Sequence, residues 1–117
     1  MALNIVAYRK VSLSGYGEGW DDCYLRVRAA NPEQVKSWSE VFESKTLTNE
    51  QAEAKFREAA NEVVVGGVIL NTNEDGSQEK ITFDKSQVAE VVAFLDLAAL
   101  REITFVSSGS DRLKASL

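Results

Sequence analysis

The chain has 117 residues, a net charge of −5, a single cysteine and no histidine. This length predicts one domain, and an apolar share of 44% is enough for one core, which argues against disorder of the whole chain. No stripe of basic residues is present, so binding to nucleic acid by phosphate neutralisation is not expected. The lack of histidine excludes a Cys–His nucleophile and any other histidine-based catalysis.

The single cysteine, the short apolar runs and the N-terminal residues together indicate a cytoplasmic protein. Cys23 has no second cysteine to pair with, so no intrachain disulfide forms, and it is expected to be a small buried hydrophobe. The longest apolar runs, Val63–Leu70 and Val91–Leu100, fall short of the ~20 apolar residues of a membrane span. The first ten residues lack the pattern of a secretory signal. The cytoplasm of a bacterial host is therefore the expected location, without a membrane partner.

The first third of the chain predicts a β-hairpin. Leu3–Leu13 is a plausible strand, and Ser14–Gly19 is a flexible glycine-rich loop of about six residues. Trp20–Ala29 alternates polar and apolar residues with the period of a half-buried strand. This alternation assigns three residues to the buried face, namely Cys23, Leu25 and Val27.

Two helices are predicted next. Asn31 followed by Pro32 is typical of a helix start, and the helix is expected to end near Ser44. Thr48 begins a second helix, and the pair Gly66-Gly67 is expected to end it as a left-handed cap. Its apolar stripe is narrow and rich in alanine, and it consists of Ala52, Phe56, Ala59, Ala60, Val63 and Val64.

The last third predicts a small second hairpin and further helices. The hairpin lies near residues 68–83, with Asp75-Gly76 in its turn. Asp84 caps a third helix, and Asp96 caps a short final one. The sequence as a whole predicts an α+β fold: an N-terminal β-hairpin, three to four α-helices packed on it and the second hairpin. Residues 1–106 form one compact domain, and residues 107–117 a mobile tail.

Sequence motifs for ligands are weak. Asn71–Gly76 resembles the first half of a calcium loop, but position 12 is Thr82 instead of a bidentate Glu, so a hairpin turn explains it better. The spacing of Gly15, Gly17 and Gly19 is not that of a dinucleotide-binding loop. No catalytic, cofactor-binding or metal-binding residue is therefore predicted.

Four large aromatic residues form the candidate interaction surface, namely Trp20, Trp38, Phe42 and Phe56. Tryptophan is enriched at binding hot spots, but large aromatics also fill the cores of small domains. The sequence leaves both alternatives open, and exposure decides between them.

The order of the elements resembles the small tail assembly chaperones of long-tailed bacteriophages and prophages. The likeness covers about residues 20–105, and the segments that carry it are Gly19–Arg28, Ala30–Val35, Val63–Gly76 and Ile81–Ile103. Gly66-Gly67 departs from the family, in which a tryptophan is common there. The resemblance implies a non-enzymatic protein that binds the helical tape-measure protein, or other phage tail proteins, while the tail forms. It carries over no catalytic residue or cofactor.

Two other functions stay open at this point. A structural tail or head–tail connector subunit, such as a tube, terminator or ring component, would also be small and non-enzymatic, and would form a homo-oligomer. An enzyme with a metal site built from carboxylates alone, for instance Asp75 with Glu79, would need several converging carboxylates.

Overall fold

The structure is a computed structural model that describes residue 3 and residues 6–109, except for the side chain of Phe42. It confirms the α+β fold. The elements, in chain order, are β1 (Tyr8–Ser12), η1 (Ser14–Tyr16), β2 (Tyr24–Arg28), α1 (Pro32–Glu43), α2 (Asn49–Val63), β3 (Val64–Thr72), β4 (Gln78–Phe83), η2 (Lys85–Gln87), α3 (Val88–Phe94) and α4 (Leu97–Ser107). Among the described residues, no helix has both the length and the apolar composition that a membrane crossing requires.

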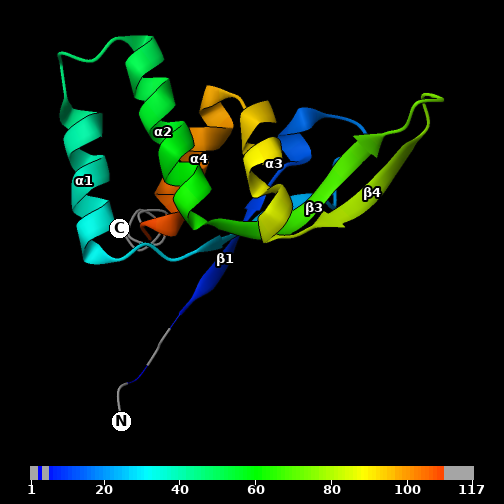
Figure 1. The fold of residues 1–117 in the computed structure, drawn as a ribbon, viewed down its shortest axis with the longest axis horizontal. Helices are drawn as coiled ribbons and strands as arrows, with labels where there is room; N and C mark the ends of the chain where they lie inside the picture. The colour runs from blue at the N-terminus through cyan, green and yellow to red at the C-terminus, as the bar shows by residue number, and fades with distance from the viewer. Residues whose placement is uncertain (1–2, 4–5, 110–117) are drawn as a thin grey trace.

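The two predicted hairpins belong to one sheet. The four strands are antiparallel neighbours in the order β1-β2-β3-β4. The N-terminal hairpin therefore continues directly into the C-terminal one, across the pair Tyr24 and Val68. The helices lie on one side of this sheet, and the β3–β4 hairpin extends past them (Figure 1).

The predicted helix caps are confirmed. The Asn31 side chain accepts a hydrogen bond from the backbone N–H of Gln34 at 2.8 Å, and Thr48 accepts one from Gln51 at 3.1 Å. Asp96 caps α4 in the same way. These bonds satisfy N–H groups that the first turn of a helix leaves without a partner.

Asp84 also acts as a cap, although the element that follows it first is the short 3₁₀ turn η2 rather than α3 itself. Its carboxylate accepts bonds from the backbone N–H of Ser86 at 3.0 Å and from the Ser86 hydroxyl. These two donors hold the pKa of Asp84 below its ordinary value, because they stabilise the charged form.

The pair Gly66-Gly67 does not end a helix, contrary to the prediction. α2 ends at Val63, and the chain turns into β3 through Val64, whose backbone is extended. Both glycines lie inside β3, where a β-bulge lets Val27 pair with Val64 while Arg26 pairs with Gly66. A Cβ atom on Gly66 would lie 2.9 Å from the carbonyl oxygen of Phe83. The glycines are therefore required by the close approach of neighbouring strands.

The hairpin connection is longer than predicted. β2 begins at Tyr24 instead of Trp20, because the segment before it forms η1 and further turns. The predicted inward face of this segment is correct, since Leu25 and Val27 of β2 and Cys23 directly before it are all buried. They pack in one core with Phe56, Ala60 and Val63 of α2 and with Leu100 and Ile103 of α4.

The end of α4 is attached to the first strands. The Ser107 hydroxyl donates to the carbonyl oxygen of Arg28 at 2.7 Å, and the backbone N–H of Ala30 donates to Ser107 at 2.9 Å. The predicted mobile tail begins at Ser107. In the structure, Ser107 is the last residue of α4 and is buried. Residues 110–117 of that tail lie outside the described residues.

Gly67→Ala is expected to destabilise the fold strongly. Gly67 has φ +148°, and an added Cβ would lie 2.2 Å from the carbonyl oxygen of Tyr24. Overpacking together with an unfavourable φ predicts a loss of about 3 kcal/mol or more in the free energy of unfolding. Urea denaturation measures this loss. Gly15→Ala is the matched control, because its Cβ would enter open space and should leave the midpoint nearly unchanged. Equal midpoints for the two variants would contradict the close strand approach.

Candidate functional site

The structure does not bring the four predicted surface residues together. Trp38 and Phe56 are only 7% and 4% exposed and belong to the core, although one edge of Trp38 lines a hollow between α1 and α2. Trp20 is partly buried on the other side of the helical layer, beside α3, and the side chain of Phe42 lies outside the described part of the chain. The alanine stripe of α2 explains the burial of Phe56, because small residues let α2 pack closely on α4.

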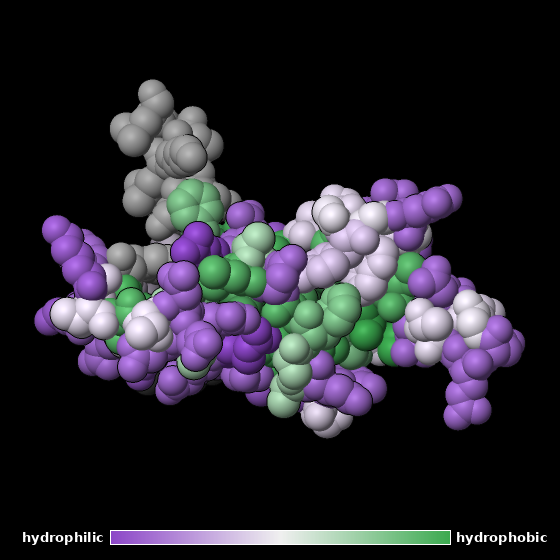
Figure 2. Space-filling view, turned by 90° about the horizontal axis from the view of Figure 1, so that it is seen from above, coloured by the Kyte–Doolittle hydropathy of each residue, from purple (hydrophilic) through white to green (hydrophobic). Residues whose placement is uncertain are grey.

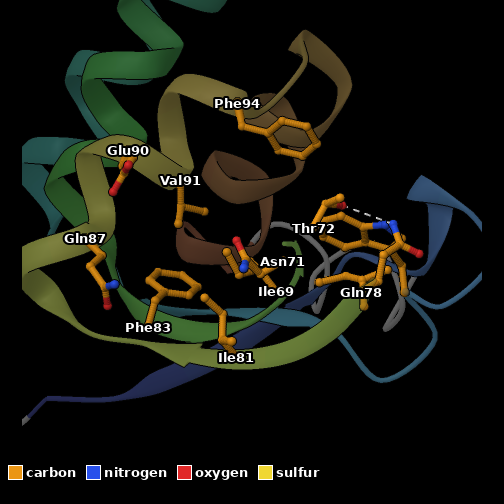
Figure 3. Close-up of a pocket in the computed structure, with 12 residues that line it drawn as sticks. Ile69, Asn71, Thr72, Gln78, Ile81, Phe83, Gln87, Glu90, Val91 and Phe94 are labelled. Atoms are coloured by element: carbon orange, nitrogen blue, oxygen red, sulfur yellow. Dashed lines mark hydrogen bonds between the residues drawn. The ribbon is translucent and has the colours of Figure 1, made fainter. Parts of the chain in front are cut away.

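A cleft lies between the β3–β4 hairpin and α3 and is called here the hairpin cleft. Its volume is about 460 Å³. Figure 3 shows side chains of the sheet pointing up into it and side chains of α3 pointing down. Its apolar lining consists of Trp20, Ile69, Leu70, Ile81, Phe83, Val91 and Phe94.

The strand register creates the floor of the cleft. Ile69 pairs with Ile81, two residues along from the pair Gly67 and Phe83, so these side chains share the face that carries the helices. α3 is only seven residues long, and the hairpin extends beyond it (Figure 1). Ile69 and Ile81 are therefore left half-buried, where a longer helix would have covered them.

Three aromatic rings lie together at one side of the cleft, and two of them, Trp20 and Phe94, line its wall. The ring of Trp20 stacks on that of Phe94 with centroids 5.9 Å apart and an interplanar angle of 7°. Tyr16 contacts both, at 5.3 Å and 5.2 Å. Phe94 nevertheless stays 58% exposed. Offset and tilted ring pairs of this kind add stability beyond area burial, so the wall presents an ordered apolar surface to solvent.

Tyr16 is held in place by Asp96. Its hydroxyl donates to Asp96 Oδ1 at 3.3 Å and accepts from the Asp96 backbone N–H at 3.2 Å. Partial burial raises the pKa of Tyr16 above its ordinary value, and the nearby negative charge of Asp96 acts in the same direction. The cap of α4 and the aromatic wall therefore share one carboxylate.

The rim of the cleft is polar and almost uncharged. Gln78 Nε2 donates to Thr72 Oγ1 at 3.3 Å, the contact dashed in Figure 3. Among the residues that line the cleft, Glu90 is the one ionisable group. The lining thus offers apolar contact and a few neutral hydrogen-bonding groups, which is the composition of a binding site for apolar side chains.

The resemblance to a calcium loop is explained by the hairpin turn. Asp75 Oδ1 accepts bonds from the backbone N–H of Ser77 at 2.9 Å and from its hydroxyl at 2.6 Å, which lowers the pKa of Asp75. Within the described residues, no group of three or more Cys, Asp or Glu side chains is placed to hold a metal ion. Cys23 is buried, and burial raises the pKa of its thiol.

The predicted surface included Trp20 but not Phe94, the exposed aromatic residue of the cleft. Phe94 lies off the buried stripe of α3, which consists of Val88, Val91 and Val92. A large aromatic on the solvent side of an amphipathic helix is the sequence signal that identifies it. Seen from above, apolar side chains form an open band in the middle of the molecule, with hydrophilic surface at both ends (Figure 2).

No protein-family model, no curated protein and no solved structure matches this chain. The hairpin cleft and the surface charges are therefore the features of the molecule that bear on its function.

Phe56→Ala is expected to lower the free energy of unfolding by about 3–5 kcal/mol, because it empties a core position. This is a large part of the total stability of a small domain. Thermal or urea unfolding measures the loss. Phe94→Ala deletes the same side chain at an exposed position and serves as control, with a loss of about 1 kcal/mol or less expected. Similar losses for both variants would contradict the assignment of Phe56 to the core.

The raised pKa of Tyr16 predicts a loss of stability in alkali. A pKa raised by folding gives a contribution that is complete below the unfolded value of about 10 and is lost as the pH rises through the folded value. Tyr16→Phe should be less stable than wild type at neutral pH by about 0.5–1.5 kcal/mol, from the lost hydrogen bonds. This difference should shrink above pH ~10. Urea denaturation across the pH range tests it, and a constant difference would refute the coupling.

Proposed function

We propose that this protein is a non-enzymatic binding protein that holds an apolar stripe of a helical partner in the hairpin cleft. The observation that carries the proposal is the exposed Phe94, stacked on Trp20 above a hairpin floor that α3 covers only in part. An exposed apolar patch of this kind is typical of a site for protein–protein contact.

The chemistry of the cleft favours a helix with apolar side chains on one face. Ile69 and Ile81 on the floor and Phe94 on the wall offer apolar contact on two sides. An amphipathic helix presents side chains at positions i, i+3, i+4 and i+7, which fit a groove of this form. Burial of the aromatic wall supplies the affinity, since each large apolar side chain removed from water contributes about 1.5–3 kcal/mol.

This role agrees with the one that the resemblance to tail assembly chaperones implies. Such a protein binds the long helical tape-measure protein in the bacterial cytoplasm and keeps its apolar stripes from aggregating. The net charge of −5 supports this, because it keeps a protein with exposed apolar surface soluble. The lining of the cleft, apolar contact with a single ionisable side chain, supports a role in binding.

The experiment is coexpression with a bacteriophage tape-measure protein from the genome that encodes this chain, followed by pull-down and measurement of tape-measure solubility. Phe94→Ser should weaken the complex by about 2 kcal/mol, roughly thirtyfold, as expected for a central aromatic anchor. Its melting temperature should change little, because Phe94 is 58% exposed.

Leu3→Ser is the matched control. It removes another exposed apolar side chain, 82% exposed, that does not line the cleft. Binding should therefore equal that of wild type. Wild-type protein that forms no complex, or a Phe94→Ser variant that binds as tightly as the control, would refute the proposal.

A further inference from the structure

The side of the sheet opposite the helices carries a group of positive charges. β1 pairs with β2 so that Lys10 is opposite Arg26 and Tyr8 is opposite Arg28. The residues between them along each strand point the other way, and most of those are buried in the core. The basic face is defined here by Tyr8, Lys10, Tyr24, Arg26 and Arg28.

The cations of the basic face lie on aromatic rings. Lys10 Nζ is 4.4 Å from the centroid of Tyr24, and Arg26 Cζ is 4.1 Å from that of Tyr8. Arg28 donates to the neutral side chain of Gln34 at 3.5 Å. Within the described part of the chain, none of these three cations forms an ion pair, although the protein carries more acidic than basic groups. The basic face therefore retains positive charge that a partner can neutralise.

An anionic protein surface fits this face better than nucleic acid. Single-stranded nucleic acid binds by stacking its bases on free aromatic rings, and here Arg26 and Lys10 already lie over the rings of Tyr8 and Tyr24. Three cations also give few of the phosphate contacts that sustain binding at physiological salt.

The same molecule has an acidic groove between α1 and α2. Its volume is about 290 Å³, and it is lined by Glu33, Glu58 and Glu62, with Lys55 as the one basic group. All three carboxylates are exposed. Glu62 accepts a bond from the Gln34 amide at 3.3 Å, and no ion pair within the described residues involves any of the three.

We propose that the basic face of one molecule docks on the acidic groove of a second copy of this chain. The two surfaces have complementary charge, and every molecule carries both. They are different surfaces, so the contact is heterologous and links copies head to tail into a ring or a filament. Because the contact depends on charges near solvent, it weakens as salt screens them. The contact uses no residue of the hairpin cleft, so it can fail or succeed independently of the proposed function.

Sedimentation equilibrium at low and high ionic strength tests this proposal. At low salt the weight-average mass of wild type should rise with concentration above the 12.9 kDa of one chain, and it should return to that mass at high salt. Lys10→Gln with Arg26→Gln, and separately Glu58→Gln with Glu62→Gln, should each raise the dissociation constant by about tenfold or more. All four side chains are exposed, so the variants should stay folded, and the loss of the two cation–π contacts should lower the melting temperature only slightly.

Lys45→Gln with Lys85→Gln is the matched control, because it removes two exposed positive charges outside the basic face and should associate as wild type does. An equimolar mixture of the two neutralised variants should form a 1:1 pair and grow no further, since one intact basic face then meets one intact acidic groove. A wild type that stays monomeric at low salt, or association that the two variants leave intact, would overturn the proposal. So would a monomer whose Arg26 instead binds a single-stranded oligothymidylate probe.

Discussion

The contact that the rest of the structure depends on is the close approach of three strands around Gly66 and Gly67. Backbone carbonyls of Tyr24 and Phe83 occupy the space where side chains at these positions would lie. β3 can therefore run between β2 and β4 and join two local hairpins in one sheet. That sheet has one face under the helices and one face open, and its last hairpin extends past α3. Both the hairpin cleft and the basic face follow from this arrangement.

Local features of the fold could be predicted because their physical causes are local. A cap such as Asn31 or Thr48 acts on a backbone group three residues away, and the alternation in β2 needs only the burial of one face. Gly66-Gly67 could not be assigned in this way. A helix cap and a close strand approach both select glycine, and the residues that decide between them, Tyr24 and Phe83, are distant in sequence.

The candidate sites show the same limit. Trp38 and Phe56 are residue types that often anchor interfaces, but the packing of α1 and α4 around α2 buries both of them. Phe94 becomes accessible because α3 is short and the hairpin beyond it is uncovered. The basic face could not be predicted from the order of residues along the chain, because Lys10 and Arg26 become neighbours only when β1 pairs with β2. A net charge of −5 conceals such a local excess of positive charge.

The two proposed contacts rest on different physics, and together they suit a long partner. The hairpin cleft is on the helical side of the sheet and is apolar, so salt has little influence on it, whereas the basic face is on the opposite side and depends on charge. If copies associate through the basic face, their clefts form an array. A tape-measure helix with repeated apolar stripes would then meet several clefts at once, and each further contact would be intramolecular. Avidity of this kind exceeds the affinity of one cleft by orders of magnitude, and a rise in ionic strength would release the partner by dispersing the array.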